Sequence, residues 1–163
     1  MKNHILSLIL ITSIFSGCSK SQKESEEKFR AEINNLFHKN LSDCNTDVSA
    51  ITDFNGKPEF WKICELNNES QIIQIESHKD SIFYQEIYFS KNGDLIYAKE
   101  TENYMPNNSF NQMAWNCEFY ARNGELISLI SLGHGKTEDE EWDSDIIFEM
   151  YNKRIEEIKR IEK

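Results

Sequence analysis

The chain has 163 residues and a formal net charge of −10, with 28 acidic residues against 18 basic ones. This balance argues against nucleic-acid binding, which needs a basic surface to meet the phosphates, and it disfavours electrostatic attraction to anionic lipid. The length is sufficient for one domain with its own hydrophobic core, but not for two.

The chain begins with the features of an export signal. Lys2 supplies a positive charge, and residues 5–15 form an apolar run that polar residues follow closely. A transmembrane helix needs about 20 apolar residues, so this shorter run favours a signal peptide. Phe15, Ser16, Gly17 and Cys18 follow in order and resemble the lipobox of bacterial lipoproteins. The alternative is an ordinary secretory signal with a chance cysteine.

The lipobox resemblance implies cleavage before Cys18 and acylation of that cysteine with palmitate-type chains. Two or more acyl chains hold a protein stably on a membrane. We therefore expect a signal peptide at 1–17, a lipidated tether at 18–24 and a single domain at 25–163. The resemblance places the protein in the cell envelope, on the outer membrane, facing the periplasm or the cell surface. Residues 22–27 also resemble an acidic surface-export signal, which leaves both orientations open.

The first predicted element of the domain is a helix over residues 24–41. Its apolar residues recur at steps of three and four, which makes one stripe for packing: Phe29, Ile33, Leu36, Phe37 and Leu41. The polar residues 19–27 before the stripe are typical of a solvated tether. Residues 43–58 are rich in turn formers, and Asn55-Gly56 is a possible hairpin turn that Pro58 weakens.

From residue 59 the apolar period changes to two, which predicts strands. The expected strands are 60–66, 70–77, 82–90, 95–101, 115–121 and 126–132. Asn92-Gly93 and Asn123-Gly124 separate the last four into two hairpins, because Asn-Gly favours the type I′ turn. The neighbourhoods 88–96 and 119–127 are similar enough to be one unit used twice.

A two-residue turn fixes the register of its hairpin. Around Asn92-Gly93 it pairs Phe89 with Ile96 and Tyr88 with Tyr97. Around Asn123-Gly124 it places Leu126 and Ile130 on one face with Trp115, Cys117 and Phe119. Three tyrosines then share a face, Tyr84, Tyr88 and Tyr97, which predicts a contact face for protein or glycan. The alternative is that these rings only pack on the sheet.

A second helix is expected over residues 140–161. Its packing stripe contains Ile147, Met150, Tyr151, Ile158 and Ile161, and its basic residues lie in the later turns, as the helix dipole favours. The predicted fold is α+β. It has an N-terminal helix, an antiparallel meander of about five to six strands with two Asn-Gly hairpins, and a C-terminal helix packed on the sheet. We expect both helices to cover one sheet face.

Three cysteines remain after Cys18 is assigned to lipid: Cys44, Cys64 and Cys117. In an oxidising compartment, one pair among them can form a disulfide. Cys64 and Cys117 both lie in predicted strands, so their pairing is the preferred prediction. Three buried thiols are the alternative.

No residue pattern predicts a catalytic site, a metal site or a cofactor. His38, His78 and His134 are far apart and belong to no metal-binding motif. His134 lies between two glycines in a post-strand turn, where a functional role is a minor alternative. The acidic residues 138–145 would suit Ca²⁺, but they lack the EF-hand spacing, and acids before a helix are ordinary. Residues 80–82 resemble the short O-glycosylation site of Bacteroidetes exported proteins.

The chain as a whole resembles small uncharacterised Bacteroidetes lipoproteins, which carry Tyr- and Phe-rich strand pairs around Asn-Gly or Asp-Gly turns. The resemblance implies a membrane-anchored envelope lipoprotein and no particular activity. We therefore expect a non-enzymatic binding or structural module with an unknown protein or glycan partner. The alternatives are an immunity-type lipoprotein that neutralises a toxin in the periplasm, and an enzyme with an unrecognised site.

Overall fold

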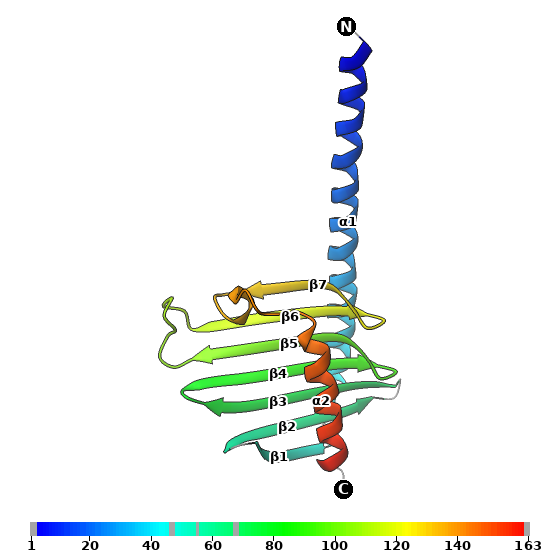
Figure 1. The fold of residues 1–163 in the computed structure, drawn as a ribbon. Coiled ribbons are helices and arrows are strands. Elements are labelled where there is room, and N and C mark those ends of the chain that lie inside the picture. The colour runs from blue at the N-terminus through cyan, green and yellow to red at the C-terminus, as the bar shows by residue number, and fades with distance from the viewer. Residues whose placement is uncertain (1–2, 46–47, 55, 67–68, 162–163) are drawn as a thin grey trace.

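The computed structural model describes residues 3–45, 48–54, 56–66 and 69–161, with the side chains of these residues from Gln22 onward except that of Phe54. Helix α1 (Asn3–Ser42) leads into one antiparallel sheet, and helix α2 (Ile146–Ile161) closes the chain after a single 3-10 turn, η1 (Lys136–Glu138). The seven strands follow one another in spatial order as a simple meander (Figure 1). They are β1 (Val48–Phe54), β2 (Lys57–Leu66), β3 (Ser70–Lys79), β4 (Ile82–Lys91), β5 (Asp94–Tyr104), β6 (Ala114–Arg122) and β7 (Glu125–Leu132).

The two helices cover opposite faces of the sheet, with α1 behind it and α2 in front of it (Figure 1). The expectation that both cover one face is therefore wrong. Apolar side chains point to both faces, so each face needs a cover. One core joins Phe29 and Phe37 of α1 to strand residues such as Ile72. The other core joins α2 to the opposite side of the strands, in a set that includes Trp61, Ile63, Ile73, Ile75, Phe119, Ile147, Tyr151 and Ile158.

The sheet has seven strands where five to six were expected, because β1 forms within the segment predicted as turns. β1 and β2 make a hairpin in which Phe54 pairs with Lys57. Gly56 between these two strands has a φ of 74°, whereas Asn55 of the possible Asn55-Gly56 turn lies outside the described residues. Pro58 pairs with Asp53 of β1, one residue before the pairing of β2 with β3 begins.

Both predicted Asn-Gly turns are confirmed, since Asn92, Gly93, Asn123 and Gly124 all have positive φ values as type I′ turns require. The registers beyond the turns are wrong by one residue. Phe89 pairs with Tyr97, not Ile96, and Tyr88 pairs with Ala98.

The cause is a β-bulge, which places one extra residue in a strand and turns the following side chains to the other face. In the first hairpin the register shifts between Phe89 and Ser90, which leaves Ile96 as the extra residue. The second hairpin shifts at the equivalent place, which leaves Ile127 as the extra residue. Ile130 consequently packs in the α1-side core, away from Cys117. The two hairpins thus share both the turn and the bulge, as expected for one unit used twice.

The helices keep their predicted stripes but not their predicted starts. α1 begins at Asn3, so the backbone predicted as a tether continues the helix. α2 begins at Ile146 and not at residue 140. Before it, Asp139 accepts a hydrogen bond from the Glu141 amide and Asp143 accepts one from the Asp145 amide. Such local bonds compete with the helix. Within the described part of the chain, no helix combines the length and apolarity needed to cross a bilayer.

α1 crosses the strands from β7 toward β2. Arg30 donates a hydrogen bond to Ser128 of β7 at 2.8 Å, and the Tyr120 hydroxyl of β6 donates one to Asn34 at 3.1 Å. At the far end of α1, the chain is bonded to β2 through the Cys44–Cys64 disulfide. The N-terminal part of α1 extends beyond the β7 edge (Figure 1).

Candidate functional site

The sheet face under α2 carries four glutamates from three strands. Glu86 of β4 and Glu100 of β5 are direct cross-strand neighbours. Glu102 lies two residues further along β5, and Glu59 lies on β2. Glu59, Glu100 and Glu102 are each at most 8% exposed. We call these four residues the carboxylate band. Burying so many acids is costly unless cations pair with them.

Arg154 of α2 is the cation for one half of the band. Its guanidinium donates to both Glu59 oxygens at 3.1 Å and to both Glu86 oxygens at 2.9 Å. It also donates to Glu157 at 2.7 Å, and its charge lies 5.3 Å from the Trp61 ring. Burial alone would raise the pKa of Glu86, but the hydrogen bonds and charge of Arg154 outweigh it and hold that pKa below its usual value.

Lys136 of η1 serves the other half of the band. Its ammonium group lies 2.9 Å from Glu100 and 3.3 Å from Glu102. Burial raises the pKa of Glu100 despite this lysine, and the neighbouring Glu86 and Glu102 add to the effect. Each acid of the band therefore has a cationic partner. The arrangement ties α2 and η1 to the sheet, which is a structural role.

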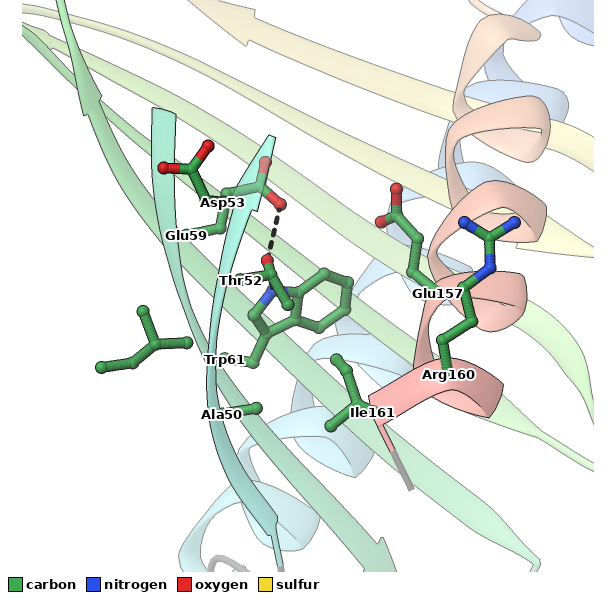
Figure 2. Close-up of a pocket in the computed structure, with 9 residues that line it drawn as sticks. Ala50, Thr52, Asp53, Glu59, Trp61, Glu157, Arg160 and Ile161 are labelled. Carbon is green, nitrogen blue, oxygen red and sulfur yellow. Dashed lines mark hydrogen bonds between the residues drawn. The ribbon is translucent and has the colours of Figure 1, made fainter. Parts of the chain in front are cut away.

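A pocket of about 400 Å³ lies beside the Arg154 half, between β1, β2 and the end of α2. Figure 2 shows Asp53 and Glu59 on the strand side, Glu157 and Arg160 on the helix side, and Trp61 and Ile161 toward the middle. The Trp61 indole N–H donates to the Thr52 hydroxyl at 2.8 Å, and the Thr52 hydroxyl lies 3.4 Å from Glu59. The strand wall is thus acidic, whereas the helix wall carries one acid and one base, and Trp61 and Ile161 lie between the two walls. Ala50 and Ile51 also line the pocket.

The opposite sheet face is covered by α1 at one end only. The row of cross-strand neighbours under α1 is Cys64, Ile72, Phe89, Tyr97, Tyr120 and Ser128. Four residues further along the strands lies a second row, which we call the open row. Its members are Phe60, Glu76, Gln85, Thr101, Asn116 and Leu132.

The open row is polar at its centre and apolar at its ends. Gln85 donates to Glu76 at 3.1 Å and Thr101 donates to Asn116 at 3.0 Å. Phe60 is 46% exposed and Leu132 is 64% exposed. A hollow of about 350 Å³ lies at the Phe60 end, lined by Ser49, Ala50, Ile51, Phe60, Trp61, Lys62, Gln74 and Glu76. Exposed apolar groups beside polar ones are typical of a binding surface.

The predicted contact face of Tyr84, Tyr88 and Tyr97 does not exist as such. Tyr88 is 1% exposed and packs in the core under α2, whereas Tyr97 is 3% exposed and packs against α1. Tyr84 lies on the α2 side, paired with Glu102, and the Lys57 ammonium lies 4.6 Å from its ring centre. The bulge after Leu95 explains the separation, since it turns Tyr97 to the other face.

The preferred disulfide, Cys64–Cys117, is also wrong. Cys64 is bonded to Cys44, with a Cα–Cα distance of 5.7 Å, and Cys117 is a free buried thiol. Cys64 faces α1 whereas Cys117 faces α2, and β3, β4 and β5 lie between their strands. Burial, with Glu100 and Glu118 nearby, raises the pKa of Cys117 to about 12. The predicted lipidation site, Cys18, has its side chain outside the described residues.

The remaining candidates make local contacts only. His134 pairs with Glu138, and its ring stacks on Phe110 with centroids 4.3 Å apart. His78 lies 4.9 Å from the Phe83 ring and His38 lies 5.4 Å from the Phe37 ring. Among the described side chains, no group of three or more His, Cys, Asp or Glu residues could hold a metal ion.

Neither the carboxylate band nor the role of Arg154 was predicted from the sequence. A signal was present in the helix, because Arg154 lies between Tyr151 and Ile158 in the stripe that packs on the sheet. An arginine in an apolar stripe requires buried acids opposite it. Glu100 and Glu102 are hard to recognise from the sequence alone, since the face on which they lie depends on the bulge at Ile96.

No family model matches the chain, and no curated protein or solved structure matches it either. The fold and the two sheet faces therefore define the class of protein only as an α+β domain with helices on both sides of a seven-stranded meander.

Proposed function

We propose that the protein is a lipid-anchored, non-enzymatic component of the bacterial cell envelope that binds a protein partner through the Phe60 end of the open row. The anchor follows from the resemblance of residues 15–18 to a lipobox. The observation that supports binding is the incomplete cover of the sheet. α2 packs on one face, whereas α1 does not reach the open row on the other face, where Phe60 is exposed and the central polar residues are half-buried.

A protein partner suits the chemistry of this surface. Ile51 and Phe60 pair across β1 and β2 and are 72% and 46% exposed. Lys62, Gln74 and Glu76 surround them in the hollow. Protein interfaces combine apolar anchors in a central pocket with a polar rim that excludes water. The hollow at the Phe60 end of the open row, together with Ile51, therefore provides both the anchors and the rim.

Two experiments test the two parts of the proposal. For the anchor, labelling with a palmitate analogue should mark the wild type and not Cys18→Ala, and Cys18→Ala should leave the membrane fraction. For the partner, a photo-crosslinking amino acid is placed at position 51 or 60 in cells, with position 149 on α2 as the control. Glu149 is exposed and lies on the other face of the sheet.

We expect one discrete, protease-sensitive adduct from positions 51 and 60 and none from position 149. An adduct that resists protease but yields to glycosidases would instead identify a glycan. Absence of any adduct, or the same adduct from all three positions, would overturn the proposal for the open row and leave the anchor unaffected.

A further inference from the structure

One corner of the domain gathers exposed apolar side chains. Met105, Phe110 and Met113 lie in the β5–β6 loop and are 58%, 60% and 73% exposed. Leu132 ends β7 and is 64% exposed. We call these four residues the apolar corner. They are most of the large apolar side chains that are strongly exposed in the described part of the chain. Exposed apolar side chains that lie together usually mark a surface that contacts another molecule or a membrane.

The two segments that form the corner, residues 103–117 and 126–135, contain no Asp, Glu, Lys or Arg, in a chain of which 28% is charged. Glu138, which pairs with His134, lies at the border of the corner. The two segments are held together. The His134 amide donates to the Gln112 side chain at 2.7 Å, the Asn108 side chain donates to the His134 carbonyl at 3.4 Å, and Phe110 stacks on His134. These contacts fix the β5–β6 loop, which carries Met105, Phe110 and Met113, against the segment that follows Leu132.

The direction of α1 places this corner on the side of the predicted anchor. α1 contacts β7 through Arg30 and Ser128 and then extends past the β7 edge (Figure 1). Cys18 precedes Arg30 by twelve residues, or about 18 Å of helix. Leu132 follows Ser128 by four residues, or about 13 Å of strand. Because α1 crosses the strands roughly at right angles (Figure 1), these two lengths mean that a tilt of the domain by about 55° brings the corner to the surface in which Cys18 is held.

We propose that the apolar corner rests on the lipid bilayer that carries the acyl anchor. The inference depends on the proposed lipidation of Cys18. Exposed Phe, Met and Leu side chains enter the headgroup boundary, as apolar faces do in interfacial proteins. The neutral Asn and Gln neighbours tolerate a zwitterionic surface, whereas the acidic remainder of the domain disfavours lipid. Because the anchor keeps the corner at high local concentration, weak contacts suffice.

The test uses full-length acylated protein in phosphatidylcholine–phosphatidylethanolamine vesicles. A cysteine is introduced as Met113→Cys or, as a matched control, Ile51→Cys, and labelled with an environment-sensitive fluorophore. The two sites are 73% and 72% exposed, but Ile51 lies on β1, at the opposite edge of the sheet. Cys117 is buried, so background labelling is measured on the wild type.

We expect a blue shift and quenching by nitroxide-labelled lipid at position 113, and neither at position 51. Adding Phe110→Ser and Leu132→Ser should abolish both signals at position 113. If an anchored protein gives no quenching at 113, or equal quenching at 51, the inference is wrong while the anchor stands. If the labelled molecules self-associate and position 113 is not quenched by lipid, the corner instead contacts a second copy of the protein, and the inference is wrong. Absence of palmitate labelling would remove the anchor itself.

Discussion

The strongest prediction concerns the arginine that neutralises the carboxylate band. Arg154 donates five hydrogen bonds to Glu59, Glu86 and Glu157 and is 8% exposed. Replacing it with methionine keeps much of the apolar volume but leaves buried carboxylates without a cation. Breaking a buried ion pair on one side costs about 3–5 kcal/mol. We therefore expect Arg154→Met to lower the free energy of unfolding by that amount, which is about 2 M in a urea midpoint.

The assay is urea unfolding followed by tryptophan fluorescence and circular dichroism. Arg160→Met is the matched control, since Arg160 lies on the same helix but is exposed, and surface substitutions usually change stability by less than about 0.5 kcal/mol. In Glu59→Met/Glu86→Met/Arg154→Met the charges disappear together, so most of the loss should be recovered. A failure to recover would assign the loss to packing.

The same variant has a pH signature. In the wild type the pKa of Glu86 is lower in the folded state than in the unfolded state. Ionised Glu86 therefore stabilises the fold at a pH above its unfolded-state pKa, and this stabilisation is lost as the pH falls through its folded-state pKa. Without Arg154, burial dominates and raises that pKa, which reverses the sign. The deficit of Arg154→Met should therefore be smaller at pH 4.5 than at pH 7.5. The reasoning is refuted if Arg154→Met lowers the free energy of unfolding by less than about 1 kcal/mol or by no more than Arg160→Met does. It is also refuted if the deficit of Arg154→Met does not change with pH.

Three further predictions concern the cysteines and glycines. Cys44→Ser should destabilise the oxidised protein by about 3 kcal/mol for a loop of 20 residues, and reductant should destabilise the wild type but not this variant. Cys117, with its pKa raised to about 12, should resist a thiol reagent in the native protein and should react only after urea has unfolded the protein. Immediate reaction of the native protein would contradict the burial of this thiol. Gly135→Ala should cost about 1–3 kcal/mol because a Cβ there overlaps the Trp115 ring, whereas Gly124→Ala has open space and should cost only the positive φ, about 1 kcal/mol.

The sequence was sufficient wherever local chemistry determines structure. Asn92-Gly93 and Asn123-Gly124 encode their turns directly, and the stripes of both helices were found from spacing alone. The bulges at Ile96 and Ile127 were not predictable, because they depend on how the strands pack between two helices and not on the turn residues. Misplacing them moved Tyr97 to the wrong face and hid the faces of Glu100 and Glu102.

The disulfide and the first strand were missed for related reasons. Cys64 and Cys117 both lie in strands, but sequence alone does not say that three strands separate them or that they face opposite helices. β1 carries Ser49, Thr52 and Asp53 among four apolar residues that do not alternate regularly with them, so its period of two is weak. Residues 48–54 form a strand because their backbone pairs with the edge of β2.

The Cys44–Cys64 bond has a mechanical consequence. A pull on the N-terminal end of α1 travels along the helix and through the chain to Cys44. There the covalent link passes the load directly to β2, so β1 is bypassed and the sheet is not peeled from its first edge. The load instead acts in shear on the whole contact between α1 and the sheet, from Ser128 to Cys64, where the hydrogen bonds and apolar contacts of the helix must break together. Reduction of that one bond would redirect the force to a single edge strand.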